Sequence, residues 1–423
     1  MLAHDRFGNV IDRTVGYARG TILASSLEES QRRAHALELI RRRIEDCGRH
    51  AIFNFTGHRR GFLARCADLG DDLAEEWVGS ALVEERLAQL ARVHFGASDN
   101  DHVALFNRSA AGIIALLLAL VPESRRVLAV APRRRTHPSV RRGIALARAV
   151  LDEHDPEESL RKSQFLDTKL VVITRVTSEL DIMPPDAVAT VIAAAHEAGV
   201  PVFVDDAYGT RVAPILLAQP KSLTTGADVA ITSCDKAALG GPRAGLMVGS
   251  ADLVERALAK ASEMGLEARG PLMLGVLRAL EGFAAQMLRD DADMAKEITV
   301  RLRAKFRTEC VLDLPMGPTI SEEDILSIAL DTGQRIINQP ILVPAEATCL
   351  LGMSLLERHG ILTSNVAERP GARPSLRLRP TAEEVKRFGG PQKVVDTIAD
   401  AFAHLRRLIE DVGGAKRMIL GPN

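Results

Sequence analysis

The stretch DVAITSCDKAALGGPRAGLMVG, Asp228–Gly249, decides the fold. Its apolar runs Val229–Ile231 and Leu246–Val248 predict two strands, and the Gly-Gly-Pro-Arg sequence between them predicts a tight turn. Lys236 stands between the first run and the turn, among small residues. Lysine is rarely buried unless it has a partner or a function. Two interpretations follow: Lys236 forms a Schiff base with pyridoxal 5'-phosphate (PLP), or it is a surface lysine at a strand end.

A second stretch, VPVFVDDAYG at Val200–Gly209, favours the first interpretation. Val202–Val204 predicts a buried parallel strand whose carboxyl end is where ligands bind in open α/β sheets. Asp205 follows that strand and can keep the pyridine nitrogen of PLP protonated, which makes the ring an electron sink. Ala207 is small enough to lie under a flat ring, and Tyr208 can donate to its phenolate oxygen. The alternative is that the paired acids bind a metal or cap a helix.

Three motifs carry a resemblance to a known family: D-x-A-Y at Asp205–Tyr208, T-S-x-x-K at Thr232–Lys236 and G-P-R-A-G at Gly241–Gly245. Together they resemble fold-type I PLP enzymes, and among these the selenocysteine synthase-like group. That group contains bacterial L-seryl-tRNA selenium transferase and small archaeal relatives of unassigned activity. The resemblance extends from about residue 52 to residue 393. It implies PLP as cofactor and an α/β fold of the aspartate aminotransferase type, with a mostly parallel sheet and a smaller α+β C-terminal domain.

The cofactor phosphate is expected at the strand-to-helix turn after Val103–Phe106. A turn of small residues before an apolar helix, here residues 111–121, offers backbone N–H groups and the positive end of the helix dipole to an anion. Relatives bind the phosphate at this place, although Ser109 alone also fits an ordinary helix N-cap. A hydroxyl and a guanidinium from the lysine stretch can complete the site. The predicted phosphate contacts are Arg108, Ser109, Ala110, Ser233 and Arg243.

His137 lies between a predicted strand, Val127–Ala131, and a predicted helix, Ser139–Val150. Relatives stack an imidazole or aromatic ring on the outer face of PLP, and His137 matches that position. We therefore include it with Lys236 and Asp205 among the predicted catalytic residues. The alternative is that His137 caps the helix that follows it.

The predicted substrate contacts are dispersed along the chain. Arg377 lies in a late predicted strand, Ser375–Pro380, where fold-type I enzymes bind the substrate α-carboxylate; Arg379 shares its strand face and is the second choice. Both also fit charged residues of an edge strand. The other candidates are Arg59 or Arg60 after an N-x-T-G stretch, Ser178 in the loop after the strand at 170–174, and Arg269 before a predicted helix that runs from residue 271 to about residue 289.

The length of 423 residues permits a large core and a smaller lobe. We predict an N-terminal arm and helix (1–50), a PLP-binding large domain (51–293) and a small C-terminal domain (294–423). Short strands are expected in the small domain at Val311–Leu314, Ser327–Ala329 and Gln339–Val343, and the last dozen residues are expected to form a tail.

Composition limits the partners and the compartment. The net charge of −1 argues against non-specific binding to nucleic acid or to an anionic membrane. The five cysteines are scattered without a C-x-x-C pair, and the first residues do not form a signal peptide. We therefore expect a cytoplasmic protein with no metal site.

The predicted reaction starts from a Schiff base at Lys236, whose freed amine then removes the α-proton of an amino acid or a similar amino substrate. The resemblance favours β-elimination or β-replacement, so the protein is expected to be a lyase or transferase. Transamination is the alternative, and an enzyme acting on aminoacyl-tRNA is a weaker one. The presence of Lys236, Asp205 and Arg243 argues against a non-catalytic binding protein. Active sites of this fold normally form between two subunits, so at least a homodimer is expected.

Overall fold

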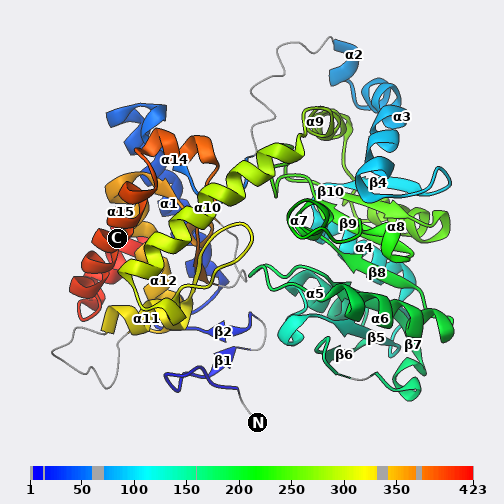
Figure 1. Ribbon diagram of the computed structural model, residues 1–423, viewed down its shortest axis with the longest axis horizontal. Coiled ribbons are helices and arrows are strands. Elements are labelled where there is room, and N and C mark those ends of the chain that lie inside the picture. Colours follow the sequence, from blue (N-terminus) through cyan, green and yellow to red (C-terminus); the bar gives the residue numbers. More distant parts are fainter. Residues whose placement is uncertain are drawn as a thin grey trace. The chain divides into compact units, whose positions relative to one another are not determined.

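The computed structural model describes residues 3–12, 15–59, 71–158, 160–330, 342–367 and 374–422. The chain divides into two compact units, and we describe each by itself (Figure 1). Unit 1 comprises residues 1–57 and 290–423, and unit 2 comprises residues 58–289. The N-terminal arm and its helix are therefore part of the same compact unit as the C-terminal third of the chain.

Unit 2 is built on a central sheet in which the described residues form seven strands in the order β4-β10-β9-β8-β7-β5-β6. The strands β9, β8, β7, β5 and β6 run parallel, and β10 pairs antiparallel with both β9 and β4. The mostly parallel α/β organisation is as predicted. The strands are β4 (His102–Phe106), β5 (Arg126–Val130), β6 (Val150–His154), β7 (Thr168–Thr174), β8 (Val202–Asp205), β9 (Val229–Ser233) and β10 (Gly245–Gly249).

Helices cover both faces of this sheet, so its strands are apolar on both sides. On β7, Val171 and Ile173 belong to one core, and Leu170 and Val172 belong to another, because successive side chains of a strand point to opposite faces. This explains why the strand sequences are continuous apolar runs instead of alternating ones. The helices of unit 2 are α2 (Asp71–Ala74), α3 (Glu76–Phe95), α4 (Ser109–Leu120), α5 (Pro138–Leu146), α6 (Pro185–Glu197), α7 (Gly209–Leu216), α8 (Ala251–Glu263) and α9 (Gly270–Glu281).

Unit 1 is mostly helical and centres on α12, whose residues from Pro344 to Leu356 are all buried. The N-terminal arm is attached to this helix by Glu346, whose Oε1 accepts hydrogen bonds from the backbone N–H groups of Ile22 (2.6 Å) and Leu23 (2.9 Å). Within the described residues, unit 1 also contains three two-stranded sheets, β1-β2, β11-β13 and β3-β12.

The elements of unit 1 follow the chain from its N-terminus, and α10 begins in unit 2. They are β1 (Ile11–Asp12), β2 (Tyr17–Ala18), α1 (Ser26–Cys47), β3 (Phe53–Asn54), α10 (Ala285–Lys305), β11 (Thr319–Ser321), α11 (Glu322–Leu330), α12 (Pro344–His359), β12 (Ile361–Leu362), α13 (Ser364–Ala367), β13 (Ser375–Arg377), α14 (Ala382–Phe388), α15 (Pro391–Leu408) and α16 (Val412–Leu420).

Two predictions in unit 2 were wrong. The helix predicted at Ser139–Val150 ends at Leu146, and Val150 begins the edge strand β6, which was concealed because its last three residues are all polar. The helix expected to continue to about residue 289 ends at Glu281, and α10 begins after a break at Gly282.

Three predictions in unit 1 were also wrong. The triplet Ser327–Ala329 lies within α11, where its apolar residues belong to a helical face that is buried in the core. The predicted tail contains α16, which buries Ala415 and Ile419 on one face because these residues are four apart. Residues 311–314 form an isolated bridge from Leu312 to Thr319 in place of a strand. Residues 339–341 of the other predicted strand lie outside the described ranges.

Two properties of the described residues concern partners and chemistry. None of the described helices combines the length and the hydropathy that crossing a membrane requires. Within the same ranges, no group of three or more His, Cys, Asp or Glu side chains is arranged to hold a metal ion. The cysteines Cys47, Cys234, Cys310 and Cys349 are free thiols.

Candidate active site

Two neighbouring parallel strands bring the predicted acid and the predicted lysine to one edge of the sheet. Asp205 is the last residue of β8 and pairs in register with Ile231 of β9. Lys236 follows the end of β9 by three residues and is half-buried. Because the carboxyl ends of parallel strands meet at the same edge, residues 31 positions apart in the chain become neighbours.

Asp205 is a buried carboxylate whose Oδ1 has no hydrogen-bond partner within the described residues. Only 3% of the residue is exposed, and burial raises the pKa of its carboxyl group to about 6 against the opposing attraction of Lys236. A buried polar atom that makes no hydrogen bond is costly, so such atoms are usually satisfied by a ligand or serve a function. The Oδ1 atom of Asp205 can therefore accept a hydrogen bond from a donor that binds at this strand end.

The next residue, Asp206, also keeps its Oδ1 without a hydrogen-bond partner among the described residues, but its Oδ2 has two partners. Its Oδ2 accepts a hydrogen bond from the Ser222 hydroxyl (2.6 Å) and lies 3.3 Å from Nη2 of Arg175. The Thr232 hydroxyl donates to the Asp206 backbone carbonyl (3.1 Å), and the Asp206 N–H donates to the carbonyl of Ile231 (3.0 Å). Asp206 thus attaches the end of β8 to β9 and fixes the direction in which Asp205 points.

Lys236 is held in a compact turn. Its Nζ lies 4.5 Å from the centre of the Tyr208 ring, a distance at which the ring face attracts a cation. Ala237 (φ 47°) and Ala238 (φ 65°) follow in the left-handed region, which is unfavourable for residues with a Cβ. Such strain concentrates at functional sites, where the surrounding structure compensates for it.

The predicted phosphate site lies at the N-terminus of α4. Arg108 is the N-cap residue, and Ser109 and Ala110 are the first two residues of the helix, so Ser109 is not itself the cap. The Ser233 hydroxyl at the end of β9 donates to the Ser109 hydroxyl (3.1 Å). A Cβ on Gly245 would stand 2.4 Å from the Ser109 Cα, which only glycine permits. Backbone N–H groups, hydroxyls and a helix N-terminus therefore lie together here, a combination that suits an anion.

Arg243 and Asp235 form a pair beside Lys236. The Nε of Arg243 lies 3.8 Å from Oδ2 of Asp235, which is 3% exposed. Arg243 keeps 28% of its side chain exposed. The guanidinium therefore remains accessible to an anion while the buried carboxylate restrains it.

His137 caps a helix, which is the alternative that the sequence left open. Its Nδ1 accepts a hydrogen bond from the backbone N–H of Ser139 (3.2 Å), so the proton of a neutral ring is on Nε2. Ser178 lies half-buried in the loop after β7, where the N–H of Leu180 donates to the carbonyl of Thr177 (3.0 Å). Stacking by His137 and substrate contact by Ser178 stay predictions.

The remaining candidates lie in different places. In unit 2, the Cδ of Arg59 is 4.0 Å from the position that a Cβ on Gly240 would take, and exposed Arg269 is the N-cap residue of α9. In unit 1, Arg377 and Arg379 are both 4% exposed. Ala207 is half-buried between the ends of β8 and β9, since its carbonyl accepts the N–H of Ser233 (3.4 Å). Arg60 lies outside the described ranges.

Sequence reasoning missed one residue of the site, Arg211. Its side chain is fully buried, and its Nη2 donates to the carbonyl of Ser233 (2.7 Å), directly below the lysine turn. Its Nη1 donates to Nε2 of His94 (3.0 Å), and burial together with Arg211 lowers the pKa of His94 to about 3, so the imidazole is neutral. An arginine on a short helix resembles a surface residue, so the pattern gave no indication of this role.

These residues fit PLP. Asp205 offers an unsatisfied carboxylate oxygen to the pyridine N–H, and Lys236 provides the amine for the aldehyde. The α4 N-terminus with Ser109, Ser233 and Arg243 provides for a phosphate. The close approach of Gly245 to Ser109 shapes that cradle. The requirements of this cofactor for a charge partner, an amine and an anion site are thus all present in unit 2.

Comparisons with known proteins agree with this chemistry. A family model described as Beta-eliminating lyase matches residues 136–308. A "UPF0425 pyridoxal phosphate-dependent protein" of Methanothermobacter thermautotrophicus is 36% identical over 403 residues, which are 95% of this chain and 100% of the relative.

Solved structures extend the comparison to the fold. N-succinyldiaminopimelate aminotransferase of Mycobacterium tuberculosis aligns with a TM-score of 0.56 and 17% identity, over 94% of this chain and 99% of its own. The structure described as a SepCysS-SepCysE N-terminal domain complex aligns with a TM-score of 0.56 and 13% identity, over 84% and 95%. At these identities the likeness concerns the fold, which is the fold-type I α/β architecture predicted from the sequence.

Proposed function

Since the chain belongs to the UPF0425 family of pyridoxal phosphate-dependent proteins, we propose that it catalyses β-elimination or β-replacement on an amino acid through a Schiff base at Lys236. It is a PLP-dependent enzyme. The observation that carries the proposal is the buried Asp205 oxygen without a hydrogen-bond partner in the described residues, at the strand end next to Lys236. The match of residues 136–308 to the Beta-eliminating lyase model supports elimination over the alternative, transamination.

The residues divide the reaction among them. Bound PLP supplies an electron sink for a carbanion at the substrate Cα. Asp205 holds a proton on the pyridine nitrogen, because an ionised carboxylate in a buried site stabilises a cation beside it. The free amine of Lys236 takes the proton from the substrate Cα and can then give a proton to the leaving group on Cβ. Tyr208 faces the Lys236 amine and restricts where it moves.

The finer assignments extend the same proposal. We place the chain near the selenocysteine synthase-like group on the motifs at Asp205–Tyr208 and Thr232–Lys236. Arg377, with Arg379 as second choice, binds the α-carboxylate, while Arg59, Ser178 and Arg269 contact the rest of a small amino substrate. The functional enzyme is at least a homodimer in the cytoplasm, where the free thiols persist in reduced form.

The first experiment tests the covalent link. The purified protein should be yellow, and borohydride should attach the cofactor irreversibly to the peptide containing Lys236. The variant Lys236→Ala should lose this attachment completely. Unchanged colour and trapping in the variant would refute the assignment of Lys236.

The second experiment separates the two reactions. Candidate amino acids are incubated with the loaded enzyme, with and without a keto-acid acceptor, and keto products are measured. Elimination forms a keto acid and ammonia without an acceptor, whereas transamination requires one. A strict dependence on the acceptor would replace the proposal by transamination. Tight binding of bulk tRNA at physiological salt in a gel shift would instead favour an aminoacyl-tRNA substrate.

A further inference from the structure

The loop between β5 and α5 has an unusual backbone. It contains the short 3₁₀ segment Pro132–Arg134 and ends at His137, the N-cap residue of α5. Arg133 (φ 58°) and Arg134 (φ 54°) both adopt the left-handed conformation. Two successive non-glycine residues in this region require compensating contacts, because the Cβ of each crowds its own backbone.

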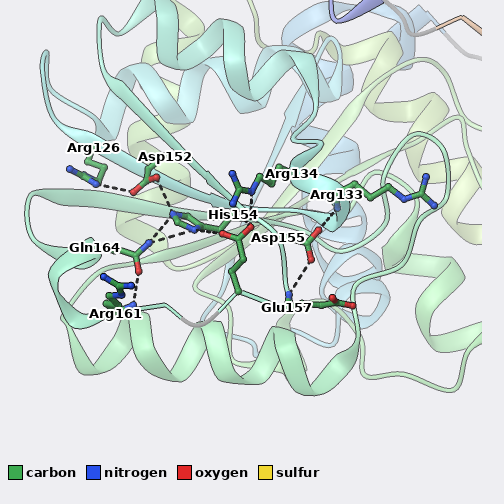
Figure 2. Close-up of polar contacts among 10 residues, drawn as sticks. Arg126, Arg133, Arg134, Asp152, His154, Asp155, Glu157, Arg161 and Gln164 are labelled. Atoms are coloured by element: carbon green, nitrogen blue, oxygen red, sulfur yellow. Dashed lines mark hydrogen bonds and ion pairs between the residues drawn. The ribbon is translucent and has the colours of Figure 1, made fainter. Parts of the chain in front are cut away.

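Two carboxylates after the edge strand β6 supply these contacts (Figure 2). The Oδ2 of Asp155 accepts the backbone N–H of Arg133 (2.6 Å). The Oε1 of Glu158 receives both Nε (2.6 Å) and Nη2 (2.5 Å) of the Arg134 guanidinium. Both nitrogens reach the same oxygen, and charge-assisted hydrogen bonds of this kind are shorter and stronger than neutral ones. We call Asp155 and Glu158 the β6 clamp.

The β6 clamp is itself held in place. His154 lies between Asp152 and Glu158, with one ring nitrogen 3.0 Å from each carboxylate. Arg126 donates to Asp152 from β5 (2.8 Å), and the Gln164 amide lies 2.9 Å from Nε2 of His154 (Figure 2). The cluster therefore alternates acids with basic or amide groups and connects β5, β6 and the segment after β6.

The same loop is joined to a second one. The Arg133 guanidinium forms an ion pair with Asp181 (2.8 Å), in the loop after β7 that also carries Ser178. Arg141 of α5 donates to the Arg134 carbonyl (3.3 Å) and pairs with Glu153 (2.9 Å). Glycine would relieve the backbone at 133 and 134, but it would remove the two guanidinium groups that make these connections.

We propose that Asp155 and Glu158 are positioning residues for the cofactor site: they hold Arg133 and Arg134 in the left-handed conformation and so fix His137 at the edge of the sheet where PLP binds. Neither residue contacts the cofactor. The proposal rests on PLP binding beside Lys236, and it is independent of whether the reaction is elimination or transamination.

The test uses substitutions that separate backbone strain from positioning. Arg134→Gly removes the strain and the Glu158 contact together, Glu158→Gln removes only the charge, and Arg134→Lys restores a cation. Arg148→Gly is the matched control, because Arg148 (φ 52°) is also left-handed and makes only an exposed pair with Glu123 at 3.6 Å among the ion pairs of the described residues. Asp167→Asn is the control for Glu158→Gln, since Asp167 pairs with Arg125 (2.7 Å) on the surface.

Four quantities are measured on the full-length protein: the urea midpoint, amide hydrogen exchange over residues 131–137 with and without PLP, the circular dichroism band of the bound cofactor, and its release rate. Arg134→Gly should keep or raise the urea midpoint while exchange and PLP release accelerate about two- to fivefold, which is the scale of one lost exposed ion pair. Glu158→Gln should have a smaller effect in the same direction, Arg134→Lys should recover part of the wild-type value, and both controls should leave exchange and the cofactor band unchanged.

Wild-type exchange and an unaltered cofactor band in both Arg134→Gly and Glu158→Gln would overturn the proposal. So would an equal change in the controls. If the wild-type protein failed to bind PLP at all, the cofactor assignment would fail, while hydrogen exchange in the cofactor-free protein would still report on the β6 clamp.

Discussion

Asp205 and Asp206 are adjacent, equally inaccessible to solvent, and placed in opposite roles. On the cofactor side of the strand end, Asp205 keeps an oxygen without a hydrogen bond from any described residue, and its carboxyl pKa is raised to about 6. On the other side, Asp206 binds Arg175 and Ser222 through Oδ2. Oδ1 of Asp206 also has no hydrogen-bond partner among the described residues, so the two carboxylates differ in their charged partners: Asp206 is paired with the buried Arg175, whereas Asp205 faces Lys236.

The difference shows how a rigid site is made from a flexible chain. The polar groups around Asp206 form hydrogen bonds and an ion pair with one another, so the ends of β8 and β9 are fixed in the protein without its cofactor. Asp205 is held in position by these contacts, and its Oδ1 can still accept a hydrogen bond from the cofactor. Substitutions in the two regions should accordingly separate stability from cofactor binding.

The largest effect is expected from Asp206→Ala. It removes the partner of Arg175, whose side chain is 3% exposed, and leaves a buried uncompensated cation. Breaking a buried pair in this way costs about 3–5 kcal/mol. Urea unfolding should show this loss with and without PLP. If the free energy of unfolding decreased only in the PLP-bound protein, Asp206 would belong to the cofactor site, and its contrast with Asp205 would be wrong.

The second prediction concerns pH and the cofactor-free protein. Since the carboxyl pKa of Asp205 rises from 3.8 to about 6 on folding, the folded state binds the proton more tightly than the unfolded state. Stability must then fall as pH rises from about 4 to about 6, by about 3 kcal/mol, and level off above. Asp205→Asn should lack this contribution. Parallel pH profiles of urea midpoints for the two proteins would contradict the raised pKa.

The third prediction concerns Asp205→Asn at neutral pH. The variant should be at least as stable as the wild type without PLP, because no buried charge remains to be desolvated. Its turnover should decrease about 100-fold or more, the scale on which an electrostatic partner of a reacting group acts. The cofactor absorbance and the rate of α-proton exchange in deuterated water measure this. A fully active Asp205→Asn would remove Asp205 from the mechanism.

The sequence pointed to the candidate cofactor residues, but not to the buried pairs that hold them in place. Asp205, Lys236, Ser109 and Ser233 follow or border apolar strands, and a parallel sheet brings such strand ends together whatever the details of packing. The support depends on pairs such as Arg175 and Asp206, which local patterns cannot reveal because they are far apart in the chain. The left-handed backbone of Arg133, Arg134, Ala237 and Ala238 could not be predicted for a similar reason. Residue propensity disfavours this conformation, and the tertiary contacts that compensate for the strain cannot be seen in the sequence.

The same limits apply to whole elements. The strands from β7 to β10 are apolar runs bounded by glycine, proline or polar turns, and their positions were predicted to within a few residues. Strand β6 has only two apolar residues before three polar ones and lies at the edge, and α16 is recognisable only from the two residues it buries. Elements whose stability comes from one surface contact therefore escape prediction, whereas those in the middle of the core do not.

The smallest effects come from a matched pair of serines, and they test the comparison most strictly. Ser222 donates to the buried Asp206 carboxylate, so Ser222→Ala should cost about 1.5–3 kcal/mol in urea unfolding. Ser233 donates to the Ser109 hydroxyl at the phosphate site, so Ser233→Ala should cost about 1 kcal/mol or less in stability and weaken PLP binding several-fold. Each substitution removes one hydroxyl, and Ser262→Ala on the exposed face of α8 is the common control. If Ser222→Ala weakened PLP binding at unchanged stability, Ser222 would belong to the cofactor site. If Ser233→Ala lowered stability without affecting PLP binding, Ser233 would be a structural residue. Either result would contradict the assignment of these two serines.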